Sequence, residues 1–376
     1  MKTIVVSAVN IVEAGPLTIL RDCLSAWSQW VADREGEYRV IAIVYKKELV
    51  DFPYIEYMET QWPKKRWINR LWYEYVSLKQ ISKTIGPVYL WFSLHDTTPN
   101  VIAEHQAVYC HNALSFYTWK FQDFVFAPKM TLLTILTKYI YRPNIHQNRY
   151  LVVQQEWFRK AMIKMFTIPH NKIIVAPPTQ LTTKATPQFT EAVPGKVTSF
   201  IYAASPNNHK NFEVICKAVD ILNNQQDLND FKVYVTLLGN ENRYAKWLHK
   251  NWGRLAPLQF VGFLSKERLQ VYYEECDCLI FPSKAESWGL PISEFSVYNK
   301  YMLLADLPYA RETAGGSRHT AFFNPDKPET LATLMMQLIN GEEQAIFKPV
   351  PITVMAEPVA DRWSDLFCKL LDNVNV

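Results

Sequence analysis

One short stretch, residues 281–295, holds most of the residue types that could do chemistry. It reads FPSKAESWGLPISEF, with Glu286 and Glu294 on either side of a Pro291 that suits the first turn of a helix. Leu290 offers no side-chain cap, so backbone N–H groups at this helix start stay available to an anion. A carboxylate can accept hydrogen bonds from the vicinal hydroxyls of a sugar or ribose. The stretch therefore indicates a phosphate site with a hydroxyl-binding carboxylate on each side.

The same two carboxylates have a plainer interpretation. Glu294 would only complement the helix dipole, and Glu286 would be a solvated loop charge. The spacing alone does not decide between the two interpretations.

The elements around this stretch alternate between strand and helix. Apolar runs predict strands at 3–9, 38–45, 87–94, 107–114, 149–155, 172–178, 198–204, 232–239, 257–263, 278–283 and 300–306. Such alternation predicts βαβ units and parallel sheets. A polar stretch, 179–196, reads as a linker between two doubly wound α/β domains. Ligands of such sheets bind beyond the carboxyl ends of the strands, where residues 283–290 should form a loop.

Composition excludes several classes of protein. The 376 residues are 49% hydrophobic and 20% charged, which indicates a globular chain of two domains. No apolar run is long enough to span a bilayer, and the N-terminal apolar run lacks a signal-peptide cleavage pattern. A net charge of +4 is too small to indicate nucleic-acid binding. The isolated cysteines fit reduced cytosolic thiols, and the lack of a GxGxxG motif argues against a dehydrogenase.

The segment ESWGLPISE resembles the E-x7-E motif of the family-4 retaining glycosyltransferases, with Glu286 and Glu294 as its two carboxylates. The segments LLADLPYARETAGG (303–316) and VGFLSKERLQVYYEECDCLIFPS (261–283) match that family's order too. The resemblance covers most of the second half of the chain and the first half loosely. It implies the GT-B fold, two Rossmann-like domains facing across a cleft. Residues 1–180 would be the acceptor-side domain, rejoined by a C-terminal helix within 358–376, and residues 181–357 would bind the donor.

The resemblance also implies roles for individual residues of the second half. Glu286 would act on the donor sugar's hydroxyls and Glu294 would bind the ribose. The backbone around Ser287, Trp288, Gly289 and Leu290 would hold the diphosphate, with Phe263 and Leu264 against the base.

A second motif, YAASPNNHKNFEVI (202–215), resembles the family segment whose lysine binds the diphosphate. Lys210 would stabilise the leaving group. Ser205 stands where the family usually has an arginine, so half of the cationic clamp is missing or supplied elsewhere. His209 and Arg243 are candidates for the second cation. A solvated lysine at a helix start is the alternative for Lys210.

Two positions in the first half match the family more weakly. Gly15 follows the first predicted strand, where the family has a glycine loop reaching toward the donor. His111 follows the apolar run AVYC, where the family often has a histidine near the reacting sugar. His95 is a weaker rival, and a structural role for a lone histidine stays open.

The resemblance implies transfer with retention from a nucleotide-diphosphate-sugar, with the leaving phosphate accepting the acceptor's proton. No DxD triplet occurs, so we expect no metal and no cofactor besides the sugar nucleotide. The acceptor would be a glycan or lipid-linked saccharide in bacterial polysaccharide or O-antigen assembly. A GT-B-fold sugar-nucleotide epimerase and a non-catalytic nucleotide-sugar-binding protein remain alternatives. An epimerase should carry additional catalytic carboxylates and histidines.

Two segments of the first half mix cations with aromatics, which suits a lipid headgroup surface. These are QWPKKRWINRLWYEYV (61–76) and TWKFQDFVFAPKMTLLTILTKYIYR (118–142). We expect a cytoplasmic protein that binds the inner face of an anionic membrane. The residues expected to make this contact are Lys64, Lys65, Arg66, Arg70, Trp62, Trp67 and Trp72. The alternative is a core helix flanked by ordinary surface cations, in which the tryptophans would be buried.

Overall fold

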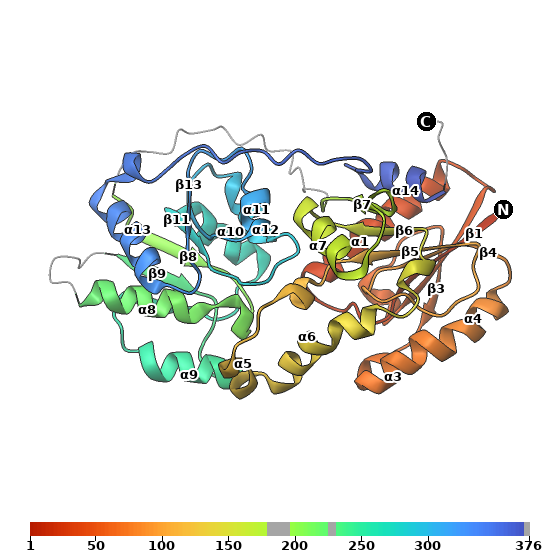
Figure 1. Ribbon diagram of the computed structural model, residues 1–376, viewed down its shortest axis with the longest axis horizontal. Helices are drawn as coiled ribbons and strands as arrows, with labels where there is room; N and C mark the ends of the chain where they lie inside the picture. The colour runs from red at the N-terminus through yellow and green to blue at the C-terminus, as the bar shows by residue number, and fades with distance from the viewer. Residues whose placement is uncertain (179–195, 225–230, 372–376) are drawn as a thin grey trace. The chain divides into compact units, whose positions relative to one another are not determined.

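The computed structural model describes residues 1–178, 196–224 and 231–371 (Figure 1). The chain divides into two compact units. The first holds residues 1–115, 136–180 and 354–376, and the second holds 116–135 and 181–353. We had expected the first domain to run without interruption to residue 180, whereas residues 116–135 pack with the second unit. The predicted linker falls almost wholly outside the described residues.

The first unit is built on a parallel seven-stranded sheet of order β3-β2-β1-β4-β5-β6-β7. Its strands are β1 (Lys2–Ala8), β2 (Tyr38–Val44), β3 (Ile55–Glu59), β4 (Val88–Ser93), β5 (His105–Cys110), β6 (Tyr150–Val153) and β7 (Ile173–Val175). Its helices are α1 (Ala14–Ala32), α2 (Trp62–Lys65), α3 (Trp67–Trp72), the π-helical turn η2 (Tyr73–Ser77), α4 (Leu78–Ile85), α7 (Glu156–Phe166) and α14 (Trp363–Leu371). Helix α6 (Pro128–Tyr141) runs from the second unit into the first.

The second unit is built on a parallel six-stranded sheet of order β10-β9-β8-β11-β12-β13. Its strands are β8 (Ser199–Tyr202), β9 (Lys232–Val235), β10 (Leu258–Phe260), β11 (Cys278–Phe281), β12 (Tyr301–Ala305) and β13 (Thr320–Phe323). Its helices are α5 (Phe121–Phe126), α8 (Phe212–Asn223), α9 (Arg243–Trp252), α10 (Lys266–Glu275), α11 (Leu290–Ser296), α12 (Pro308–Thr313) and α13 (Pro328–Asn340). The predicted doubly wound α/β architecture is therefore confirmed in both units.

The first sheet is buried on both faces, which explains its unbroken apolar strands. Successive residues of β1 point to opposite faces, so Val6 enters the core beneath α1 while Val5 enters a second core with Leu78 of α4. The strand predicted at 107–114 ends at Cys110, so His111 lies just beyond it. Strands β3 and β13 were not predicted, because each is a short run between polar segments.

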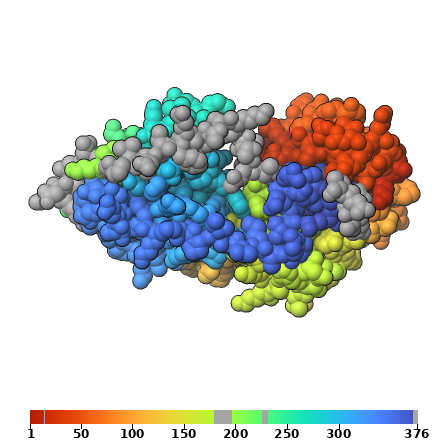
Figure 2. Space-filling model, turned by 90° about the horizontal axis from the view of Figure 1, so that it is seen from above, coloured from red at the N-terminus to blue at the C-terminus, as the bar shows by residue number. Residues whose placement is uncertain are grey.

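The C-terminal segment returns to the first unit, as expected. The ring of Phe367 in α14 stacks on Trp27 of α1 with centroids 3.6 Å apart. The blue C-terminal helix accordingly lies against the red start of the chain (Figure 2). Stacking of the two rings stabilises this contact beyond what the burial of their apolar area contributes.

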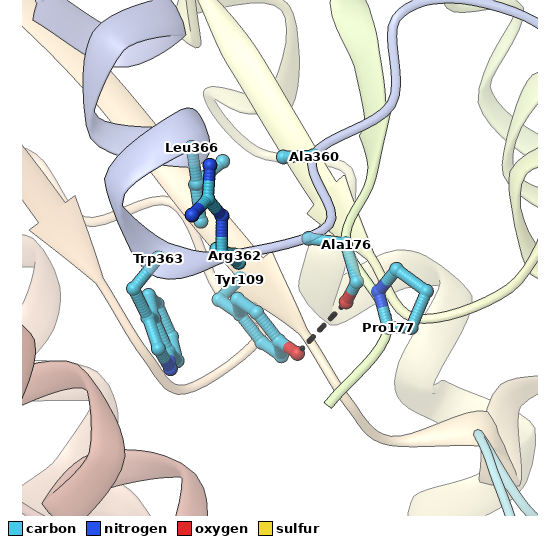
Figure 3. A pocket seen from close by; sticks show the side chains of 7 residues that line it. All are labelled: Tyr109, Ala176, Pro177, Ala360, Arg362, Trp363 and Leu366. Carbon is cyan, nitrogen blue, oxygen red and sulfur yellow. Dashed lines mark hydrogen bonds between the residues drawn. The ribbon is translucent and has the colours of Figure 1, made fainter. Parts of the chain in front are cut away.

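A small cavity lies where this return meets the ends of β5 and β7 (Figure 3). The hydroxyl of Tyr109 donates to the Ala176 carbonyl across 3.3 Å at its edge. The free volume of about 10 Å³ is enough for about one water molecule. Its lining residues are Tyr109, Ala176, Pro177, Ala360, Arg362, Trp363 and Leu366. The cavity is therefore a packing gap and no substrate site.

No helix among the described residues is both long and apolar enough to cross a membrane.

Candidate active site

The two sequence motifs of the second unit meet because their strands are neighbours. Strands β8 and β11 pair in parallel with Phe200 beside Cys278, so the loops that follow both strands leave the same edge of the sheet. Main-chain contact continues beyond the strands, where the N–H of Lys284 donates to the His209 carbonyl at 2.8 Å. The loop after β8 carries Lys210 and the loop after β11 carries Glu286, which places both at the ligand-binding edge of an open α/β sheet.

Lys210 and Glu286 form an ion pair there, with 2.5 Å between Nζ and Oε1. Their side chains are only 19% and 15% exposed, so water screens the pair weakly. The structure therefore brings together two residues that the sequence singled out separately. An ammonium group can bind a phosphate, and a carboxylate can accept hydrogen bonds from hydroxyls.

Gly289 makes the turn into α11 and has φ of +89°, in the left-handed region that favours glycine. A Cβ at this position would lie 3.1 Å from Cδ1 of Ile292, which is closer than ordinary packing. Leu290 begins α11 as its first residue, and none of the described side chains caps this helix. Within the described residues, the N–H groups of Gly289 and Leu290 have no acceptor. The turn therefore presents two main-chain donors at the start of α11.

The neighbouring side chains fix this turn. The indole of Trp288 is buried and donates to the Ser293 hydroxyl at 2.8 Å. The hydroxyl of Thr313 donates to the carbonyl of Trp288. Ser287 is half-buried, whereas Glu294, one turn into α11, is exposed. Both carboxylates of the motif are thus on the second unit, with Glu294 open to solvent.

Phe263 is the most exposed of the predicted donor-binding residues, at 91%. It follows Gly262, whose φ is +75°, while Leu264 is half-buried. Leu238 packs directly against Gly262, since a Cβ there would lie 2.9 Å from its side chain. Leu238 is itself exposed, so the loops after β9 and β10 present an apolar surface on which a planar base could lie.

Ser205, at the position where an arginine was expected, lies on the loop after β8. Ser205 is exposed and its hydroxyl accepts from Asn207 at 2.9 Å. Burial and the adjacent Lys210 lower the pKa of His209 to about 3, so His209 is neutral near pH 7 and cannot be the second cation. Arg243 begins α9, and the preceding Asn242 donates to the carbonyl of Pro206 at 2.6 Å. Arg243 is therefore the better of the two candidates.

A charged cluster that no sequence motif predicted holds these loops together. Asp326 accepts from Lys120 at 2.7 Å and from Lys284 at 3.0 Å. Asp123, on α5, accepts from Asn208 at 2.8 Å. Burial alone would raise the pKa of Asp326, but both lysines together lower it. Only the tertiary structure could reveal the cluster, because Lys120 and Asp326 are 206 positions apart.

The first unit gathers a second polar group at the carboxyl ends of its central strands. Oδ1 of Asp96 accepts from the N–H groups of His111 at 2.7 Å and Asn112 at 2.9 Å. Oδ2 of Asp96 lies 3.6 Å from Nε2 of His111. Gly15 is not on a loop, since it is the second residue of α1. Asp96 was not singled out from the sequence.

His95, the rival to His111, belongs to a buried network beneath this edge. Its Nδ1 lies 3.3 Å from Oε1 of Glu74 and its Nε2 lies 3.3 Å from the Ser7 hydroxyl. Arg70 donates to Glu74 at 2.8 Å and to the His95 carbonyl at 2.8 Å. Burial alone would raise the pKa of Glu74, but Arg70 and His95 beside it hold the pKa low. These contacts make His95 structural and leave His111 as the histidine nearer to solvent.

The predicted lipid-facing segment has its tryptophans on the surface. Trp62, Trp67 and Trp72 are 42%, 42% and 59% exposed. Lys64, Lys65 and Arg66 beside them are exposed as well. Arg70 differs from expectation, because its two hydrogen bonds turn it toward the interior. The alternative of a core helix with buried tryptophans therefore does not describe α2 and α3.

Burial makes His95 a source of pH-dependent stability. Loss of hydration lowers its pKa to about 4, against 6.5 in an unfolded chain, although Glu74 and Asp96 oppose this and Arg70 and His111 add to it. The unfolded chain thus binds the proton first as the pH falls, so this stability is complete above pH 6.5 and is lost toward pH 4. We expect the free energy of unfolding of the wild type to fall by about 1.4 kcal/mol more than that of His95→Gln between about pH 7.5 and 5.5. Urea unfolding followed by tryptophan fluorescence measures this, with exposed His146→Gln as control. Equal slopes in the wild type and His95→Gln would contradict it.

Comparisons with known proteins agree with this architecture. Residues 184–346 match the family model described as "Glycosyl transferases group 1". No curated protein matches the sequence. Among solved structures, sucrose-phosphate synthase from Thermosynechococcus elongatus is similar with a TM-score of 0.62 at 12% identity, over 93% of this chain and 95% of that one. A glycosyltransferase from Rickettsia africae gives 0.60 at 16% identity, over 92% of each chain.

A third similar structure is HepE from Anabaena, solved in complex with UDP and glucose. It has a TM-score of 0.56 at 14% identity and covers 91% of each chain. At these identities the similar structures show the fold alone, and the match to the family model is limited to residues 184–346. Residues 184–346 of the second unit are therefore similar to the glycosyltransferase group 1 family, and the chain has the GT-B-type fold of two Rossmann-like units.

Proposed function

We propose that the protein transfers a sugar from a nucleotide-diphosphate-sugar to a hydroxyl acceptor, with retention and without a metal. The observation that carries this proposal is the ion pair of Lys210 with Glu286, formed where two motif loops leave one sheet edge. The Gly289 turn in the same loop adds main-chain donors. Together these groups offer the cation, the carboxylate and the N–H groups that a sugar diphosphate needs.

The proposed reaction breaks the bond between the anomeric carbon and the diphosphate oxygen. Lys210 and the N–H groups of Gly289 and Leu290 stabilise the charge that grows on the departing diphosphate. Glu286 orients the transferred sugar through its hydroxyls, and Glu294 binds the ribose. The acceptor oxygen bonds to the anomeric carbon on the face that the diphosphate leaves, and the acceptor's proton passes to a phosphate oxygen. His111 contacts the reacting sugar.

The donor class has support from a similar structure. HepE from Anabaena was solved with UDP and glucose. We propose a sugar nucleotide as donor here as well, with its base against Phe263 and Leu238. The exposed apolar side chains suit a purine and a pyrimidine equally, so the screen of sugar nucleotides must identify the base.

We propose that the acceptor is a glycan or lipid-linked saccharide of bacterial polysaccharide or O-antigen assembly, met at the inner face of an anionic membrane. The exposed Trp62, Trp67 and Trp72 beside Lys64, Lys65 and Arg66 support this, since aromatic rings and cations together suit the headgroup region. Helix α6 has a similar surface. Its buried residues include Thr131, Thr134 and Thr137, while Met130, Leu132, Leu136 and Tyr139 are exposed.

The epimerase alternative has one observation in its favour, the pairing of Asp96 with His111. Against it, Glu74 and His95 are occupied by Arg70, Thr97 and Ser7. A transferase consumes the donor only to glycosylate an acceptor, whereas an epimerase converts the sugar nucleotide by itself.

Direct assay tests the reaction. Sugar nucleotides are first ranked by the rise in thermal midpoint, since a ligand of the native state stabilises it. The best donor is then incubated with saccharide acceptors in EDTA, and the product linkage is read by NMR. We expect transfer at full rate in EDTA with the donor's anomeric configuration retained. Recovery of activity only after Mg²⁺ or Mn²⁺ is added, an inverted linkage, or an epimerised donor without product would each overturn that part of the proposal.

Substitution of Glu294 and substitution of Glu286 should have different effects on activity. Glu294→Ala should weaken donor binding about 10- to 100-fold, because a hydrogen bond to a charged group contributes about 1.5–3 kcal/mol. Glu286→Ala should lower kcat about 100-fold, as loss of one transition-state contact commonly does. Calorimetric titration of the donor and initial rates separate these effects. Exposed Glu275→Ala on α10 is the matched control. Wild-type binding and turnover in both variants would remove the site assignment.

Membrane binding is tested by co-sedimentation with anionic and neutral vesicles. The variant Lys64→Glu, Lys65→Glu, Arg66→Glu should lose binding, because each cation near an anionic surface contributes about 1 kcal/mol. High salt should weaken the wild type. A matched control carries the same charge change on exposed residues of the second unit, Lys246→Glu, Lys250→Glu, Arg254→Glu. Equal sedimentation of the two triple variants would refute membrane binding through residues 62–72 and favour a soluble acceptor.

A further inference from the structure

Polar residues follow the carboxyl ends of four neighbouring strands of the first sheet, β1, β4, β5 and β6. The parallel register aligns Ser7 of β1 with Ser93 of β4, Ser93 with Val108 of β5, and Cys110 of β5 with Val153 of β6. The residues that follow these strand ends within one to three positions include Asn10, Asp96, His111 and Gln154. They lie at the carboxyl edge, where open α/β sheets bind ligands.

Asp96 holds the loop that carries His111. Its carboxylate accepts the main-chain N–H groups of both His111 and Asn112, and its second oxygen faces Nε2 of the imidazole at 3.6 Å. The backbone of Asp96 has φ of +65°, a conformation that is uncommon for a residue with a side chain. Arg70 fixes the preceding residue through the His95 carbonyl. The buried network beneath this edge thus keeps Asp96 in a conformation that it would rarely adopt alone.

Several polar atoms at this edge are buried and have no hydrogen-bond partner among the described residues. They are Nδ1 of His111, Oε1 of Gln154, and both amide atoms of Asn10. Gln154 is only 4% exposed, so its oxygen has little access to bulk water. Buried polar atoms rarely stay unpaired in native proteins. Neutral donors and acceptors in such a group match the hydroxyls of an uncharged ligand.

We propose that Asp96 is a positioning residue that holds Nε2 of His111 toward its carboxylate and so presents Nδ1 to a hydroxyl of a bound saccharide. This inference rests on the proposed function for the identity of the ligand. With its proton on Nε2, the neutral imidazole has a free acceptor at Nδ1. Asn10 and Gln154 supply further partners for neighbouring hydroxyls.

The first test reads the imidazole itself and needs no activity. Long-range proton–nitrogen NMR spectra of histidine-labelled protein at mildly alkaline pH report which ring nitrogen carries the proton, and His111→Gln assigns the signal. We expect the His111 proton on Nε2 in the wild type and a mixture of tautomers in Asp96→Ala. Asp96→Asn should move the proton to Nδ1, because its single oxygen stays with the two main-chain N–H groups and its amide N–H then donates to Nε2. A proton on Nδ1 in the wild type, or an unchanged spectrum in Asp96→Ala, would overturn the inference.

The second test is a double-mutant comparison of transfer rates. Asp96→Ala and His111→Ala should each lower kcat about 10-fold with donor KM within about two-fold, and the double variant should be no slower than His111→Ala. Losses that multiply would show that Asp96 acts without His111. If the tautomers behave as expected but the wild type transfers no sugar, the proposed function fails and the positioning by Asp96 stands.

Discussion

The parallel pairing of β8 with β11 is the constraint on which the candidate site depends. Lys210 and Glu286 are 76 positions apart and meet because these strands are neighbours and their loops leave the same edge. The main-chain bond from Lys284 to His209 carries this alignment beyond the strands. The largely buried ion pair then follows from the topology. A lysine and a carboxylate on unpaired loops would instead spend most of their time in water, where such a pair contributes little.

Residues 116–135 add a second constraint on the same loops. Asp123 holds Asn208, two positions before Lys210, and Lys120 shares Asp326 with Lys284, two positions before Glu286. Phe126 packs against Tyr244 and Trp247 with ring centroids 5.4 Å and 5.0 Å away. The segment is therefore attached by apolar contacts on α9 and by charged contacts at the motif loops. Ordered loops lose less conformational freedom when a ligand binds, which favours affinity.

The sequence predicted the architecture because its signals are local. Most strands are continuous apolar runs in the sequence. The segment ESWGLPISE likewise holds a turn and two carboxylates within a few residues. Contacts between distant residues left no such signal. The charge of Arg70 looked like that of its neighbours Lys64 and Lys65, yet it forms a buried ion pair with Glu74. Asp96 followed an apolar run without any motif, and its importance appears only with its left-handed backbone and its bonds to His111. The placement of 116–135 with the second unit likewise depends on partners more than 80 positions away.

The two sheet edges differ in a way that fits the two halves of a glycosyl transfer. The edge of the second unit carries Lys210 and Lys284, which are paired with Glu286 and Asp326, and the exposed Arg243 at the start of α9. At the edge of the first unit, Arg70 pairs with Glu74, and Asp96 binds main-chain N–H groups. Atoms of Asn10, His111 and Gln154 there have no partner within the described part of the chain. A diphosphate requires fixed cations and N–H groups, since unpaired buried charge is costly. A saccharide hydroxyl both donates and accepts, so neutral groups bind it without that cost. Under the proposed function, the second unit would bind the charged leaving group and the first unit would bind hydroxyls of an uncharged sugar.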